Sequence, residues 1–188
     1  MELSPTAYVI LGMLRSEPKS GYEIKQIVDH STRFFCAASY GQIYPELRTL
    51  AKAGLVEGES QPTGGRKRTV YRLTDAGREE LRSWLAQPPE HLELRDEGLL
   101  KLFFAAAADP GQAVEIIDAK QRLMEEKLAA LRAIEPRAAD YASSDPYPYL
   151  VLRYGLESTE WVIEWCERAR AELTGTKSKP KKKTRRAA

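Results

Sequence analysis

The sequence predicts a mainly α-helical protein with one small β-hairpin in its front half. Apolar residues recur at helical spacing through most of the 188-residue chain. Two short β-like runs, 55–59 and 69–73, interrupt this pattern, and the segment 60–68 between them contains a Gly-Gly pair typical of a turn. Ser-x-x-Glu and Ser-x-x-Gln capping motifs mark where helices begin. These features together favour short helices around a hairpin, followed by longer helices.

Composition excludes several classes of protein. With 43% apolar and 30% charged residues, the chain resembles a soluble globular protein that can bury a core. No apolar run is long enough to span a membrane, and the N-terminus lacks the basic start of a secretion signal. Two cysteines (Cys36, Cys166) and two histidines (His30, His91) fit neither a disulfide framework nor a zinc module. We therefore expect a cytoplasmic protein with no metal, no cofactor and no membrane partner.

Charge divides the chain into three segments, which we expect to be its domains. Residues 1–86 carry a net charge of +2, residues 87–174 a net charge of −7, and residues 175–188 a net charge of +7. Gln87-Pro88-Pro89 separates the first two segments, and the last is a basic, low-complexity tail expected to be disordered. The tail could raise non-specific DNA affinity or serve only as a solubilising end.

The front segment reads as three capped helices before the hairpin and one after it. Ser4-Pro5 and Ser20 begin the first two, and a Ser39-x-x-Gln42 box begins a third over 39–54. Pro45 would lie in the second turn of that helix, which must then kink or start later. Gly54 is expected to end it.

The back segment reads as helical throughout. A helix of about 14 residues should carry the apolar run 99–104, a long helix should follow to about Glu135 and stop at Pro136, and a last helix should span roughly 147–173. The last helix has two adjacent apolar stripes, so self-association is the simplest way to cover both.

The order helix, helix, helix, two strands, helix is that of a winged helix-turn-helix, with 39–54 as the recognition helix. Its polar face and the basic hairpin tip suit a nucleic acid, because Arg and Gln bond base edges while Tyr and cations reach phosphates. On periodicity alone these residues could equally be solvated. Tyr22 and Tyr71 are expected to pack between elements. The residues expected to contact DNA are Tyr40, Gln42, Tyr44, Arg48, Thr63, Arg66, Lys67 and Arg68.

These motifs resemble the PadR family of transcriptional regulators over nearly all of residues 5–86. The resemblance rests on an ordered set of segments: Leu11-Gly12-Met13-Leu14, Ser20-Gly21-Tyr22-Glu23-Ile24, Ser39 to Leu50, Gly54-Leu55-Val56, Thr63 to Tyr71 and Leu73 to Arg78. A proline like Pro45 also occurs in the family's recognition helix. Leu94 to Glu97, Leu99 to Phe104 and Gly155 to Trp165 resemble, less specifically, the helical dimerisation domain of the family's longer subgroup. The basic tail departs from the family pattern.

The resemblance implies a homodimeric, ligand-responsive repressor, often acting on its own promoter or a neighbouring operon, and nucleoid-associated when bound to DNA. Two-fold symmetry would place the recognition helices in successive major grooves about 34 Å apart, so the operator should be an inverted repeat. Phenolic acids, drugs and other small hydrophobic molecules are typical effectors in the family, although some members have none.

Other interpretations stay open. Phe103, Tyr154, Trp161 and Trp165 fit an effector pocket, although dimer-interface packing is the commoner role for such residues. The chain is not expected to be an enzyme, because no third group supports a His30–Cys36 dyad. The alternative function is a winged-helix module that binds a protein or RNA without sequence-specific DNA binding.

Overall fold

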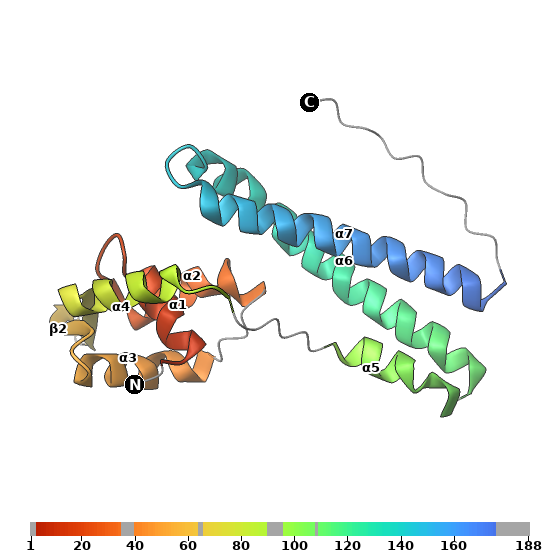
Figure 1. The fold of residues 1–188 in the computed structure, drawn as a ribbon, viewed down its shortest axis with the longest axis horizontal. Helices are drawn as coiled ribbons and strands as arrows, with labels where there is room; N and C mark the ends of the chain where they lie inside the picture. Colours follow the sequence, from red (N-terminus) through yellow and green to blue (C-terminus); the bar gives the residue numbers. More distant parts are fainter. Residues whose placement is uncertain (1–2, 35–39, 64–65, 90–95, 108, 176–188) are drawn as a thin grey trace. The chain divides into compact units, whose positions relative to one another are not determined.

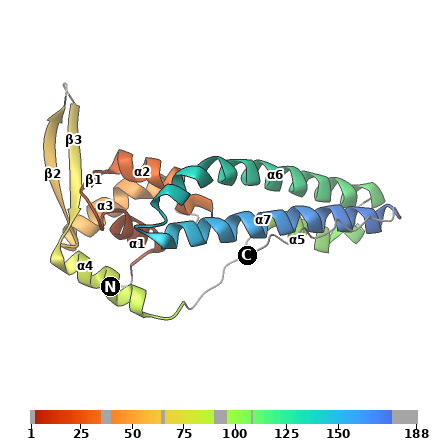
Figure 2. The same cartoon turned by 90° about the horizontal axis from the view of Figure 1, so that it is seen from above.

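The computed structural model describes residues 3–34, 40–63, 66–89, 96–107 and 109–175. The chain divides into two compact units, Met1–Leu92 and Glu93–Ala188. Figures 1 and 2 show a winged unit of short helices with a long hairpin, and a helical unit dominated by two long helices. Within the described ranges, no helix combines the length and apolarity that crossing a membrane requires. The predicted fold class, mainly α with a winged helix-turn-helix, is confirmed.

In its described residues, the winged unit contains four α-helices and a three-stranded antiparallel sheet in the order β1-β3-β2. The short β1 was not predicted, because two residues carry no strand pattern; it pairs Lys19 with Tyr71 and Ser20 with Val70 of β3. The elements are α1 (Pro5–Met13), β1 (Lys19–Ser20), α2 (Gly21–Asp29), α3 (Ile43–Lys52), β2 (Val56–Thr63), β3 (Arg66–Leu73) and α4 (Asp75–Ala86), with 3₁₀ turns at Thr32–Phe34 and Tyr40–Gln42.

The wing is longer than the sequence predicts. Pairing of β2 with β3 runs without a break from Val56 opposite Leu73 to Thr63 opposite Arg66. The predicted tip 60–68 is therefore largely strand, and only Gly64 and Gly65 separate β2 from β3. Gly64 and Gly65 themselves lie outside the described residues. The three cations at 66–68 lie in β3 and not in the turn.

The recognition helix α3 starts later than the Ser39 box predicts. Its N-cap is Gln42, which makes no side-chain capping bond, and a 3₁₀ turn precedes it. Pro45 consequently occupies the third helical position, where no helical N–H is required. Ser39 lies outside the described residues. The predicted end is confirmed: Gly54 has φ 71°, and the Leu55 N–H donates to the Leu50 carbonyl at 3.0 Å.

The core of the winged unit is closed by its own helices and the first residues of the wing. Two side-chain hydrogen bonds tie α1 to its neighbours: Ser4 Oγ donates to Glu46 Oε1 at 3.1 Å, and Tyr8 Oη donates to Glu80 Oε1 at 3.0 Å. The Tyr8 ring also stacks on Trp84, with ring centroids 4.4 Å apart. The buried apolar residues include Ala7, Ile10, Leu11, Ile24, Val28, Ile43, Leu47, Leu50, Val56 and Leu73.

The helical unit consists of α5 (Glu97–Phe103), a 3₁₀ turn (Ala105–Ala107), α6 (Pro110–Tyr141) and α7 (Pro146–Leu173). The helices α6 and α7 pack side by side along most of their length (Figure 2). Arg132–Glu160 and Asp118–Arg170 ion pairs, at 2.8 and 3.3 Å, join them in an antiparallel arrangement.

Two predictions for this unit are wrong. The helix carrying residues 99–104 is seven residues long, because helical bonding changes to 3₁₀ type just before the Asp109-Pro110 start of α6. Pro136 does not stop α6, which continues to Tyr141. Pro136 is exposed, so water can satisfy the Arg132 carbonyl that loses its helical donor.

Candidate nucleic-acid interface

The helix α3 separates an apolar face from a polar one. Ile43, Leu47 and Leu50 are buried in the core, whereas Gln42, Tyr44, Arg48, Thr49 and Lys52 are exposed on the opposite side. Each exposed residue type can bond a base edge or a phosphate. The buried stripe therefore fixes which side chains α3 presents to a partner.

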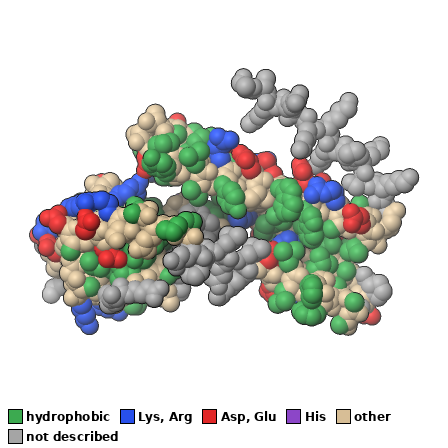
Figure 3. Space-filling model, in the orientation of Figure 1, with side chains coloured by type: hydrophobic (Ala, Val, Ile, Leu, Met, Phe, Trp, Pro, Cys, Tyr) green, Lys and Arg blue, Asp and Glu red, His purple; other side chains and the backbone are tan. Residues whose placement is uncertain are grey.

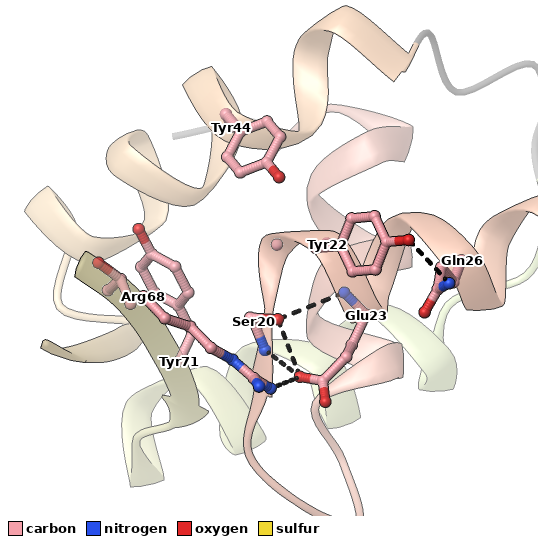
Figure 4. A pocket seen from close by; sticks show the side chains of 9 residues that line it. Ser20, Tyr22, Glu23, Gln26, Tyr44, Arg68 and Tyr71 are labelled. Carbon is pink, nitrogen blue, oxygen red and sulfur yellow. Dashed lines mark hydrogen bonds and ion pairs between the residues drawn. The ribbon is translucent and has the colours of Figure 1, made fainter. Parts of the chain in front are cut away.

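A concave pocket of about 640 Å³ lies where the N-termini of α2 and α3 meet β3. Figure 4 shows Tyr22, Tyr44 and Tyr71 around it, with Arg68 reaching from the wing towards Glu23 on α2. The Tyr22 hydroxyl accepts a hydrogen bond from Gln26 Nε2 at 3.1 Å. The pocket thus combines aromatic faces with polar groups on the surface that includes the start of α3.

Two glycines hold tyrosines in this pocket. A Cβ on Gly21 would lie 2.7 Å from Tyr44 Cε1, and a Cβ on Gly58 would lie 2.9 Å from Tyr71 Cε1. Both approaches are closer than side chains allow, so each ring lies directly against the glycine backbone. Tyr44 is consequently placed by α2 as well as by its own helix.

The carboxylate of Glu23 joins α2 to the wing. Its Oε2 accepts from the Ser20 N–H at 2.8 Å and the Ser20 hydroxyl at 2.9 Å, and it pairs with Arg68 Nη2 at 2.5 Å (Figure 4). The Ser20 hydroxyl also accepts from the Glu23 N–H, which confirms the predicted capping box.

These contacts keep Glu23 ionised. The Ser20 backbone hydrogen bond and the Arg68 side chain lower the pKa of Glu23 from 4.5 to about 2, against the opposing effect of burial. Arg68 is therefore partnered by an anion of its own chain.

The structure places the residues predicted to contact DNA in three groups. Gln42, Tyr44 and Arg48 are exposed on or beside α3. Arg68 is half-exposed and bonded to Glu23. The backbones of Tyr40, Thr63, Arg66 and Lys67 lie in η-turn or wing positions, but their side chains are outside the described residues.

Sequence reasoning misplaced one tyrosine and missed one carboxylate. Tyr22 is 60% exposed at the pocket, not packed between elements as expected, whereas Tyr71 is half-buried. Glu23 was interpreted only as a capping residue, because its pairing with Arg68 joins positions 45 residues apart. The Ser20-Gly21-Tyr22-Glu23 segment was the available signal, since it puts an aromatic and an acid on the first turn of α2.

The predicted effector-pocket residues lie in the helical unit. Phe103 on α5 is 81% exposed, and Tyr154 and Trp161 on α7 are 70% and 57% exposed, while Trp165 is half-buried. The other stripe of α7, with Leu152, Leu156 and Cys166, is buried. Figure 3 shows hydrophobic side chains gathered on the visible surface of this unit.

The helical unit also contains a partly buried ion pair. Lys120 on α6 donates to Asp96, the N-cap residue of α5. Burial would raise the pKa of Asp96, but hydrogen bonds from Lys120 and the Leu99 N–H lower it overall. The pair therefore fixes α5 on α6. Among the described residues, no cluster of three or more His, Cys, Asp or Glu side chains could hold a metal ion.

Comparison with known proteins identifies both units. Residues 10–83 match the transcriptional regulator PadR-like family, and residues 94–174 match the C-terminal domain described as virulence activator alpha C-term. The negative transcriptional regulator PadR of Bacillus subtilis is 31% identical over 170 residues, which cover 85% of this chain and 92% of that protein.

Solved structures agree over both units. The crystal structure of Bacillus subtilis PadR in complex with operator DNA has a TM-score of 0.79 and 30% identity, covering 89% of this chain and 98% of that one. The virulence activator AphA of Vibrio cholerae has a TM-score of 0.71 and 27% identity, covering 90% and 98%. Membership in a family of regulators agrees with the expectation that the chain is not an enzyme. The chain belongs to the PadR-like family of transcriptional regulators.

Proposed function

We propose that this chain is a DNA-binding repressor that acts as a homodimer on an inverted-repeat operator and responds to a small hydrophobic effector. The observation that carries the proposal is the polar face of α3, where Gln42, Tyr44 and Arg48 stand exposed above a buried apolar stripe. A similar structure, PadR of Bacillus subtilis, was solved with operator DNA, and the similar curated protein is a negative regulator.

The wing supports the same function. Residues 66–68 of β3 are all cations, and wing cations typically contact the DNA backbone or minor groove. The segment 87–174, in contrast, carries a net charge of −7, which phosphates would repel. We therefore assign DNA contact to the winged segment 1–86, and dimerisation to the segment 87–174.

The exposed aromatic face of the helical unit supports dimerisation. Tyr154 and Trp161 lie on the stripe of α7 that α6 does not cover. Aromatic residues of this kind are typical of interface cores, and a two-fold partner would bury the same stripe on both copies. Two winged segments fixed by such a dimer would match an inverted repeat.

A small effector would act by changing the spacing of the two winged segments. PadR of Bacillus subtilis, whose structure was also solved with p-coumaric acid, has a TM-score of 0.72 and 28% identity to this chain. For this chain, Phe103, Tyr154, Trp161 and Trp165 are candidates for an effector site as well as for the interface.

The proposal is tested by fluorescence anisotropy of the full chain with duplex DNA from its own upstream intergenic region and with a scrambled duplex, over a salt series. We expect salt-dependent binding that favours the native duplex by about 10³-fold or more. Equal affinity for the two duplexes would mean that the upstream region holds no specific operator. Duplexes tiled over the neighbouring operons would then be tested. Specific binding to one of them would identify a different operator, whereas specific binding to none would favour a module that binds RNA or protein.

A further inference from the structure

The ion pair between the wing and α2 involves a residue first expected to contact DNA. Arg68 lies on β3 and Glu23 in the first turn of α2, so their 2.5 Å contact joins the hairpin to the helix-turn-helix (Figure 4). Both side chains are about 40% exposed and line the pocket beside Tyr44. The pair therefore lies at the surface that would face DNA.

The carboxylate of Glu23 is oriented by Ser20, independently of Arg68. The Ser20 N–H and hydroxyl hold Oε2 of Glu23, and Ser20 is itself paired with Val70 in the β1–β3 ladder. One serine thus belongs to β1, caps α2 and orients the carboxylate. A fixed carboxylate provides a defined docking point for the guanidinium, because little further ordering is needed when the pair forms.

Other contacts also hold the base of the wing: Val56 and Leu73 are buried in the core of the winged unit, and Tyr71 packs against it. The ladder between β1 and β3 has two residue pairs, whereas that between β2 and β3 has eight. The long ladder stiffens the hairpin itself but does not set its direction relative to α2. The core contacts anchor the base of the wing, and the short ladder and the Glu23–Arg68 contact beside it tie β3 to the start of α2.

We propose that Arg68 is a positioning residue: its contact with Glu23 holds the wing against α2, and it acts on DNA binding through the wing's position, not by contacting phosphate. The inference rests on the proposed DNA-binding function. It reassigns Arg68 from the predicted contact residues to the support of the wing, beside Tyr44 on the same surface.

The test compares the double variant Glu23→Gln/Arg68→Ala with the wild-type chain. Glutamine retains the capping-box geometry, and the two changes together leave the net charge unaltered. We expect operator binding about three- to fivefold weaker, the scale of an exposed ion pair, with an unchanged slope of log affinity against log salt. Amide exchange of the DNA-free protein should be faster at Lys19 and Val70, whereas Ser20 cannot report on the wing because its N–H donates to Glu23 itself.

The matched control is Glu57→Gln/Arg72→Ala. Arg72 on β3 also forms an ion pair, with Glu57 on β2 at 2.6 Å, but both residues lie within the hairpin. We expect this control to change neither the exchange at Lys19 and Val70 nor the affinity for operator. A control effect as large as that of Glu23→Gln/Arg68→Ala would overturn the specific role of Arg68.

Two other outcomes would overturn the proposal. A salt slope that falls by about 1 in Glu23→Gln/Arg68→Ala would show a lost phosphate contact. Unchanged exchange at Lys19 and Val70 would show that the pair does not hold the wing. If the wild-type chain did not distinguish operator from scrambled DNA, the proposed function would be refuted independently of Arg68. The exchange measurement needs no DNA and would still decide whether the Glu23–Arg68 pair holds the wing.

Discussion

The two units of this protein bury their apolar residues to different extents. In the winged unit, Ile10, Leu11 and Leu47 are fully buried among short helices and the wing. In the helical unit, two long helices bury one stripe between them and leave Phe103 and Tyr154 more than two-thirds exposed. The winged unit thus closes a core of its own. The helical unit has a surface that suits a further partner, and the proposed partner is a second copy.

The largest effect is expected from a cavity in the winged unit. Leu47→Ala removes a fully buried side chain of α3, and such changes cost about 2–5 kcal/mol. Urea unfolding followed by circular dichroism should show the loss in the transition of this unit. Leu85→Ala on α4 is the control, because Leu85 is exposed. A smaller loss for Leu47→Ala than for Leu85→Ala would contradict the assignment of the core.

The next effect is expected at the exposed face of α7. Trp161→Ala should weaken dimerisation by about 2 kcal/mol or more if Trp161 is an interface anchor, because buried tryptophans carry much of the energy of an interface. Sedimentation equilibrium over a concentration series measures this directly. Trp84→Ala, in the winged unit, should leave the association constant unchanged. A monomeric wild-type chain would refute the proposed dimer.

The parts of the fold that were predictable from sequence are those set by contacts between residues close together in the chain. The helix ends at Ser4, Ser20 and Gly54 were predictable from sequence, because each of these residues makes or permits backbone hydrogen bonds within a few residues of itself. The length of the wing was missed because residues 60–63 lack a strand pattern and extend only through pairing with β3. Pro136 was misjudged because its exposure lets water satisfy the carbonyl that loses its helical donor, and exposure is not recorded in the local pattern.

The site was predictable to a similar degree. Gln42, Tyr44 and Arg48 follow from the apolar stripe of α3, because buried positions determine exposed ones. The pairing of Arg68 with Glu23 was not predicted, because the two residues are distant in sequence and the capping box already explained the presence of Glu23. Tyr22 was misplaced because an aromatic residue suggests packing, whereas the structure leaves its side chain exposed at the pocket.

A smaller effect is expected from the polar face of α3. Arg48→Ala should cost about 1–3 kcal/mol of specific operator binding, because it removes a candidate base or phosphate contact. Anisotropy with operator and scrambled duplexes separates the two contacts: a base contact affects mainly the operator, whereas a phosphate contact affects both.

The control for Arg48 is Arg82→Ala, which removes the same charge from α4, where Arg82 pairs with Glu79. It should leave operator affinity nearly unchanged, and both variants should remain dimeric. Unchanged affinity in Arg48→Ala would remove Arg48 from the interface and would leave the α3 face without its only arginine.

The smallest effect is the pH dependence of the winged unit's stability through Glu23. Its pKa of about 2 in the folded chain lies below the ordinary value of 4.5. As pH falls, Glu23 is therefore protonated in the unfolded chain at a higher pH than in the folded chain. The stabilisation is complete above about pH 5 and is lost as pH falls through 4.5 towards 2. Because the ion pair is about half exposed, solvent screening limits the contribution to about 1 kcal/mol or less.

The difference in unfolding free energy between wild type and Glu23→Gln isolates this effect, because other carboxylates titrate alike in both proteins. It should be constant from pH 7 to about pH 5 and should shrink steadily below that. A difference that persisted unchanged to pH 2 would mean that the charge of Glu23 contributes nothing to the stability of the winged unit. Because glutamine also caps a helix, the titrating part of the difference measures the charge-dependent contacts of Glu23, with Arg68 foremost among its charged partners.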